Sequence, residues 1–267
     1  MYRKKVFQWI IAIVLLFSTF LTAMNANAET LEQRIQAYTK TIERNPNDAP
    51  SYMDRGLAYS NLGKYKLAIK DFDKAIKLIP SNIPNYLSEA YYNRGLNYYL
   101  LGMSSFFGRS SFSYAIQDYN KAIELNPNYA EAYNNRGDVY RSLAEYDKAI
   151  QDYNKAIEIN PNYAEVYLNI GNLYSLSILK EYEQAIQSYN KAIELNPNLC
   201  LAYYYRGIAY YRLKQYNVAI GDATTAIQIT PHYFIAYILR GECYKKLGDK
   251  EKAKADFAKA KELGYKG

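Results

Sequence analysis

A segment of roughly 34 residues recurs through the chain and constrains its fold more than any other feature. The copy at residues 130–163 is the most regular, so positions are counted with Ala130 as position 1. Self-similarity at a fixed period indicates stacked units that bury their apolar faces against their neighbours. Asn-Pro-Asn or a near variant recurs at Asn45, Asn126, Asn160 and Asn196, with Pro80 and Pro231 in the two other matching places. The predicted array is a half repeat at 29–48 and full repeats at 49–82, 88–129, 130–163, 164–199, 200–233 and 234–267.

Five positions hold the same residue in all the full repeats: Tyr at 4 and 11, Gly at 8, and Ala at 20 and 27. Gly and Ala allow two helices to approach closely, and aromatic rings fill the gaps between them. Pro at position 32 ends the second helix. Packing roles of this kind account for the 32 tyrosines without a cofactor or a redox function.

A charged pair varies together between the repeats. Position 7 is Arg and position 23 is Asp in five repeats, whereas the repeat 164–199 has Ile170 and Ser188 there. Joint replacement predicts an ion pair between the two helices of one repeat. The predicted pairs are Arg55 with Asp71, Arg94 with Asp118, Arg136 with Asp152, Arg206 with Asp222, and Arg240 with Asp256.

The two ends of the array differ from its middle. Positions 21 and 28 are Ile in the earlier repeats but Lys254 and Lys261 in the last one, which predicts a polar C-terminal cap. The half repeat 29–48 consists of a single helix, and its missing partner would fall within the first 28 residues.

Insertions lengthen the array in three places: residues 83–87 in a linker, residues 103–110 within the repeat 88–129, and two residues near 177–181. Phe106 and Phe107 in the second insertion are either a partner anchor or, the favoured interpretation, a cover for the adjacent helix ends.

Residues 1–28 have the pattern of a secretory signal peptide. Arg3, Lys4 and Lys5 precede the apolar run from Ile10 to Phe17, and Ala26-Asn27-Ala28 fits a cleavage site. We expect an exported protein, in the bacterial periplasm or secreted. The alternative is a membrane anchor formed by an uncleaved leader, although 18 residues from Val6 to Ala23 are short for a spanning helix.

Composition argues against several classes of function. The formal charge is +7, but lysines and acids interleave, whereas a nucleic-acid groove needs a clustered basic stripe. His232 is the single histidine and falls in a linker, so neither a catalytic cluster nor a metal site is expected, and no cofactor is implied. Cys200 and Cys243 are nine positions apart in repeat register, which makes a disulfide between them improbable.

The recurring residues of 130–163, with Tyr133, Gly137, Tyr140, Ala149 and Pro161, resemble the tetratricopeptide repeat. The resemblance covers nearly the whole chain after the leader. It implies an all-α fold, a right-handed superhelical solenoid of helical hairpins with about six and a half repeats. Such folds bind peptides or partner helices in a groove lined by the first helix of each repeat.

In that family, positions 2, 5, 9 and 12 usually face the groove. Carried over, the resemblance implies a partner-binding set of Met53, Leu57, Tyr92, Leu96, Tyr99, Asn134, Asp138, Arg141, Leu168, Asn172, Leu201, Tyr204, Ile208, Tyr211 and Ile238. Its middle is polar and its flanks are apolar, and exposed apolar surface indicates a partner site. The alternative is that these side chains pack laterally between neighbouring first helices.

Chaperone-binding members of the family clamp a carboxylate with Lys at position 5, which this sequence replaces with Met53, Tyr92, Asn134, Leu168, Tyr204 and Ile238. We therefore expect a non-catalytic adaptor that binds a protein or peptide outside the cytoplasm, with no nucleic acid and no membrane contact except through an uncleaved leader. The alternative is a structural protein that forms a homodimer through its groove.

Overall fold

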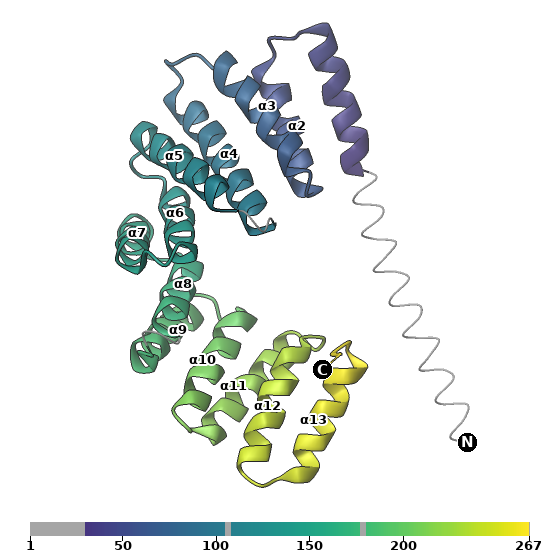
Figure 1. The fold of residues 1–267 in the computed structure, drawn as a ribbon, viewed down its shortest axis with the longest axis vertical. Helices are drawn as coiled ribbons and strands as arrows, with labels where there is room; N and C mark the ends of the chain where they lie inside the picture. Colours follow the sequence, from purple (N-terminus) through teal and green to yellow (C-terminus); the bar gives the residue numbers. More distant parts are fainter. Residues whose placement is uncertain (1–29, 105–107, 177–179, 267) are drawn as a thin grey trace, which may run out of the picture. The chain divides into compact units, whose positions relative to one another are not determined.

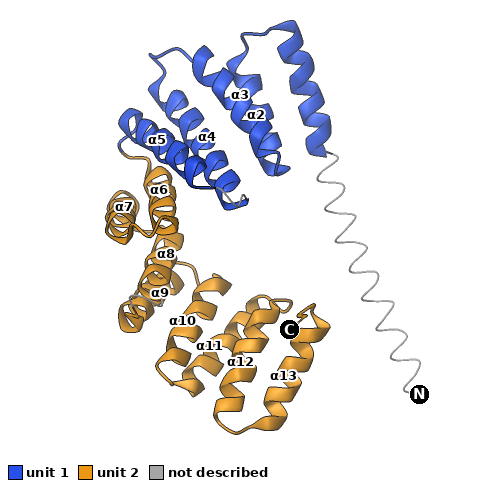
Figure 2. Cartoon of the chain, in the orientation of Figure 1, with its two compact units in different colours: residues 1–127 blue, residues 128–267 orange. Residues whose placement is uncertain are grey.

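The computed structural model describes residues 30–104, 108–176 and 180–266. The predicted signal peptide at 1–28, Phe106, Phe107 and part of the insertion near 177–181 lie outside the described residues. Within those ranges the secondary structure is α-helical and contains no strand. The chain divides into two compact units, residues 1–127 and 128–267 (Figure 2).

Unit 1 is a stack of helices, each packed against the next (Figure 1). A helix over residues 30–44 is followed by α2 (Ala49–Asn61), α3 (Tyr65–Leu78), α4 (Pro84–Ser104) and α5 (Arg109–Leu125). The prediction that residues 83–87 lengthen a linker is wrong, because α4 begins at Pro84. Proline is suited to a first helical turn, where its missing N–H is not needed.

Unit 2 contains four helical hairpins. They are formed by α6 (Ala130–Ser142) with α7 (Tyr146–Ile159), α8 (Ala164–Tyr174) with α9 (Tyr182–Leu195), α10 (Cys200–Arg212) with α11 (Tyr216–Ile229), and α12 (Phe234–Lys246) with α13 (Lys250–Glu262). Each second helix also packs against the first helix of the next hairpin. Both units therefore have the all-α helical-hairpin architecture of a solenoid.

Local sequence sets the turns between these helices. In the Asn-Pro-Asn segments, the side-chain oxygen of Asn160 accepts a hydrogen bond from the Asn162 N–H at 3.2 Å, and Asn196 does the same for Asn198 at 3.1 Å. Inside two of the hairpins, the turn uses a left-handed glycine, Gly63 (φ 70°) or Gly248 (φ 82°). A short turn of each kind holds consecutive helices side by side.

The core follows the invariant positions. Ala149 and Ala156 are fully buried beside Tyr153, whose ring lies under Gly137. A Cβ atom added to Gly137 would be 2.7 Å from that ring, closer than real contacts allow. In this repeat, glycine at position 8 is therefore required by the aromatic residue at position 24. Among the described residues, no helix has the length and apolar character needed to cross a bilayer.

Candidate functional site

All five predicted Arg–Asp pairs are formed. In each pair, Nε and Nη2 of the arginine donate to the two carboxylate oxygens at 2.6–2.9 Å, across the two helices of one repeat. The aspartates are buried, and each guanidinium also lies 5.3–5.6 Å from the ring centroid of the tyrosine at position 4. Bidentate geometry and stacking hold the hairpin together at a point where a carboxylate is taken out of water.

The arginines also contact the preceding repeat, which sequence comparison missed. Nη1 of Arg206 donates to Asn190 at 2.6 Å, and Nη1 of Arg240 donates to Thr224 at 3.2 Å. In unit 1, Arg94 reaches Asp73 at 2.6 Å and Arg55 reaches Thr39 at 3.0 Å. All four acceptors occupy position 25, where oxygen-bearing side chains of different types hide the common role. One arginine thus joins two repeats.

The repeat 164–199 replaces this polar link with apolar packing. Ile170 is buried in a cluster with Tyr153 and Ala156 of the preceding hairpin. Ser188 donates to the Gln184 carbonyl of its own helix at 3.0 Å. The backward contact is therefore retained, although its chemistry changes.

The predicted groove residues do not all face solvent. Met53, Asn134 and Leu168 are buried, so the prediction that they bind a partner is wrong for these three side chains. Position 5 turns toward the neighbouring first helix at these places, where tight packing leaves no free surface.

In unit 1, the remaining residues of the set are partly buried, and two of them pack against the second helix of their own repeat. Leu57 packs against the core cluster around Phe72. The ring of Tyr92 lies 5.9 Å from Tyr119, and that of Tyr99 lies 5.8 Å from Phe112. Leu96 is also partly buried. These contacts lie within one repeat, so they differ from the packing between neighbouring first helices that the alternative describes.

The polar middle of the predicted groove is bonded to the core beneath it. The Tyr153 hydroxyl donates to Asp138 at 2.8 Å, and Asp138 also meets Arg141 at 3.3 Å and the Asn169 amide at 3.4 Å. Burial is the main reason that the pKa of Asp138 is raised, against the opposing effects of Arg141 and Tyr153.

One repeat later, the Tyr189 hydroxyl donates to Asn172 at 2.9 Å and shares a hydrogen bond with Ser175. The tyrosine hydroxyl at position 24 thus donates a hydrogen bond to the polar side chain at position 9, which is Asp138 or Asn172. These groups support the fold, which makes them poor candidates for a partner site.

Four residues of the predicted set come together at a pocket of about 400 Å³ between α10 and α12. Helix α10 contributes Tyr204, Ile208, Tyr211 and Arg212, and α12 contributes Ile235, Ile238, Leu239 and Glu242. Leu201, also in the predicted set, lies on α10 and is exposed. Apolar walls with one positive and one negative group at the edge are typical of a site for an apolar side chain on a polar segment.

The pocket lies in the repeat whose position 24 has no ring. That position is Phe72, Tyr119, Tyr153, Tyr189 and Phe257 in the other repeats, but Ala223 here. Leu239 approaches from α12 instead, with its Cδ2 3.1 Å from where a Cβ on Gly207 would lie. Because no tyrosine hydroxyl rises beneath position 9, Ile208 can occupy it without leaving a polar atom unpaired. Ala223 therefore marks this repeat in the sequence, although it does not itself line the pocket.

Two cysteines and one histidine are further candidates for reactive side chains. Cys200 and Cys243 are free thiols, and burial raises the pKa of Cys243 to about 12, which disfavours a thiolate. His232 is exposed in the turn before α12. Within the described ranges, His, Cys, Asp and Glu do not gather in groups of three that could hold a metal ion.

Comparison with curated proteins finds similarity over part of the chain. Serine/threonine-protein phosphatase 5 of Rattus norvegicus is 41% identical over 105 residues, covering 39% of this chain and 18% of that protein. Hsp70-Hsp90 organizing protein 2 of Arabidopsis thaliana is 32% identical over 97 residues, covering 36% and 15%. The chain therefore matches less than a fifth of each of these relatives.

Solved structures share the fold over longer stretches. A structure described as a functional characterization of Pseudomonas aeruginosa pilF has a TM-score of 0.66 and 20% identity, covering 82% of this chain and 93% of that one. The crystal structure of MamA has a TM-score of 0.53 and 28% identity, covering 58% of this chain and 90% of that one.

Family models match most of the chain after residue 48. Tetratricopeptide repeat models match residues 49–82, 200–233 and 235–263. A further model, described as TPR repeat, matches residues 105–143, 137–177 and 178–214. Together with the helical hairpins and the recurring Tyr, Gly and Ala residues, these matches show that the chain belongs to the tetratricopeptide repeat family.

Proposed function

We propose that this protein is a non-catalytic adaptor that binds a peptide segment of another protein in the pocket between α10 and α12. The observation that carries the proposal is the pocket itself. It encloses about 400 Å³ of open space, and its lining includes Tyr204, Ile208, Tyr211 and Ile238. That volume accepts one or two bulky apolar side chains. Tyrosines around such a pocket supply contact area at little entropic cost.

The edge of the pocket adds a preference for charge. Arg212 is exposed on α10, and Glu242 on α12 lies 3.8 Å from Lys245. An apolar side chain next to an acidic residue would fill the pocket and reach Arg212. Similarity to the Hsp70-Hsp90 organizing protein does not extend the chaperone clamp to this chain, since position 5 holds no lysine.

The predicted leader supports a location outside the cytoplasm. Arg3 to Lys5, the apolar run and Ala26-Asn27-Ala28 together fit export and cleavage after Ala28. Amino-terminal sequencing of the protein recovered from its native compartment tests this, with Glu29 as the expected first residue. A first residue of Met1 would instead support the membrane-anchored alternative.

Peptide selection tests the binding site. Peptides of twelve residues selected from a random phage library against the full chain are measured by fluorescence anisotropy. Tyr211→Ala with Ile238→Ala is expected to weaken binding at least about tenfold, because both side chains line the pocket. Val218→Ala is the matched control, since Val218 is an exposed apolar residue on α11, outside the pocket.

Unchanged affinity in the Tyr211→Ala, Ile238→Ala variant would place the site elsewhere and overturn the proposal. Light scattering on the same samples separates the homodimer alternative. A dimer of the wild type that becomes a monomer in this variant would show that the pocket receives a second copy of the chain.

A further inference from the structure

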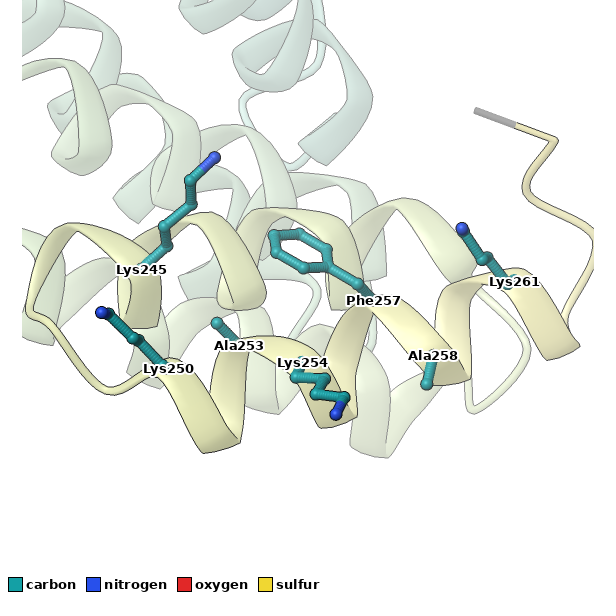
Figure 3. Close-up of a pocket in the computed structure, with 7 residues that line it drawn as sticks. All are labelled: Lys245, Lys250, Ala253, Lys254, Phe257, Ala258 and Lys261. Carbon is teal, nitrogen blue, oxygen red and sulfur yellow. The ribbon is translucent and has the colours of Figure 1, made fainter.

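A second hollow, independent of the pocket between α10 and α12, lies along the last helix of unit 2. It encloses about 410 Å³ and is lined by Phe257, Ala253, Ala258 and four lysines, Lys245, Lys250, Lys254 and Lys261. Figure 3 shows the Phe257 ring between Lys245 and Lys250 at one end and Lys261 at the other. All four lysines are exposed, so an apolar floor is surrounded by positive charge.

This surface corresponds to the face that earlier hairpins use to bind the next helix. In unit 2, Ile150 and Ile157 of α7 pack in one cluster with Val166, Ile170 and Leu173 of α8. Lys254 and Lys261 occupy the positions of those two isoleucines on α13. The backbone of α13 thus offers the same packing surface for a helix, but the side chains on that surface differ.

The changes disfavour another copy of the repeat as the occupant. At two junctions of unit 2, the incoming helix brings an arginine whose Nη1 donates to position 25, as Arg206 does to Asn190 and Arg240 to Thr224. On α13 that position is Ala258, which has no acceptor, and the lysines nearby repel a guanidinium.

Glu242 pairs with Lys245, which lines the hollow, at 3.8 Å, whereas three other nearby acids are held away from it. Asp249 pairs with Lys252 and Glu262 with Lys259, both at 2.7 Å, and Asp256 is held by Arg240. Those two lysines do not line the hollow. Lys250, Lys254 and Lys261 are consequently available to carboxylates of a partner.

We propose that this hollow binds an acidic amphipathic helix of a partner protein, lying along α13 with its apolar side on Phe257. Lys254 and Lys261 are two helical turns apart, about 10.5 Å along the axis. A partner helix that packs nearly parallel to α13 matches them with carboxylates seven residues apart. Between those carboxylates, the partner helix carries small or apolar residues at the place where the first helix of most repeats carries arginine. The apolar floor and the helix-packing surface shared with earlier hairpins favour this occupant over nucleic acid, which carries the same negative charge.

Direct binding of a designed probe tests the proposal. The probe is a hydrocarbon-stapled helix of about eighteen residues with glutamates seven apart beside a leucine and alanine stripe, and its control carries glutamines instead. With the full chain, the glutamate probe is expected to bind at least about tenfold more tightly than the glutamine one at low salt. The difference should shrink at about 1 M salt, where the Debye length is about 3 Å.

Charge exchange gives the sharper result. Lys254→Glu with Lys261→Glu is expected to lose the glutamate probe and to bind a lysine version of it. Lys66→Glu with Lys70→Glu changes two exposed lysines on α3 and should leave binding unchanged. Tyr211→Ala should also leave it unchanged, which separates this site from the proposed peptide pocket. Circular dichroism checks that each variant remains helical.

Equal binding of the glutamate and glutamine probes, or unchanged binding after charge exchange, would overturn the proposal. So would self-association that disappears on charge exchange, because a second copy would then occupy the hollow. Sedimentation with phosphatidylglycerol vesicles tests whether the hollow contacts a membrane instead of a partner helix. Vesicle binding that depends on Lys254 and Lys261, without any preference for the glutamate probe, would mark a membrane contact instead.

Discussion

The repeats 164–199 and 200–233 are neighbours in unit 2 with the same backbone plan and opposite solutions to two packing problems. The first has Ile170 and Ser188 where the second has the Arg206–Asp222 pair. The first has the Tyr189 ring at position 24, where the second has Ala223 and an open pocket. The hairpin therefore tolerates loss of the ion pair or of the ring, provided that both sides of the contact change together.

Removal of one partner of the Arg206–Asp222 ion pair is expected to have the largest effect on stability. In Asp222→Ala, the guanidinium of Arg206 loses its carboxylate partner. It stays largely buried, because the Arg206 side chain is only 19% exposed. We expect a loss of about 2–4 kcal/mol in the free energy of unfolding. Urea denaturation followed by circular dichroism measures it. Ser188→Ala is the control and should change stability little, since that hydroxyl bonds only within its own helix.

The second prediction is that the glycines at position 8 of these two repeats differ in their tolerance of substitution. A Cβ on Gly171 would lie 2.4 Å from the buried Tyr189 ring, whereas one on Gly207 would meet the Leu239 methyl at 3.1 Å. Gly171→Ala is expected to cost about 1–3 kcal/mol by overpacking. Gly207→Ala should be nearly neutral, because Leu239 can move and alanine favours the helix by about 1 kcal/mol. Thermal unfolding of both variants compares them, and equal losses would contradict the role given to the ring.

Transplanting the pair sharpens the comparison further. Ile170→Arg and Ser188→Asp are each expected to destabilise, since one side chain alone leaves a buried charge or loses packing with α7. Together they should destabilise less than the sum, with a coupling energy of about 1 kcal/mol or more. A double-mutant cycle in urea measures that coupling. Strict additivity would mean that the helices of this repeat cannot bring positions 7 and 23 together.

The smallest effect concerns the polar network one repeat earlier. The raised pKa of Asp138 means that the folded state holds its proton more tightly than the unfolded chain does. The stabilisation from that proton is present below the unfolded pKa, about 3.9, and is lost as the pH rises through the folded value. Asp138→Asn should remove this dependence while still accepting the Tyr153 hydroxyl. Unfolding curves at several pH values for both proteins test the direction.

Sequence comparison predicted the helical hairpins and the five ion pairs because both rest on residues that recur at fixed positions. It could not predict the second contact of Arg55, Arg94, Arg206 and Arg240, because position 25 is Thr39, Asp73, Asn190 or Thr224 and these residues share only a side-chain oxygen atom. Of the groove set, Tyr204, Ile208, Tyr211 and Ile238 line the pocket, whereas Met53, Asn134 and Leu168 are buried and were wrong as groove residues. Side-chain burial depends on the rotation of each first helix, which repeat register alone does not give.

The most direct test of the account is to close the pocket by supplying the missing ring. Ala223→Tyr with Leu239→Asn recreates the combination of Tyr153 and Asn169, which the preceding hairpins already accommodate. Affinity for the phage-selected peptides is measured by anisotropy in the folded variant, with circular dichroism confirming its helices. The account predicts at least about tenfold weaker binding, because the ring would take the place of the Leu239 side chain and fill the space beneath Ile208. Undiminished binding in the folded variant would contradict it.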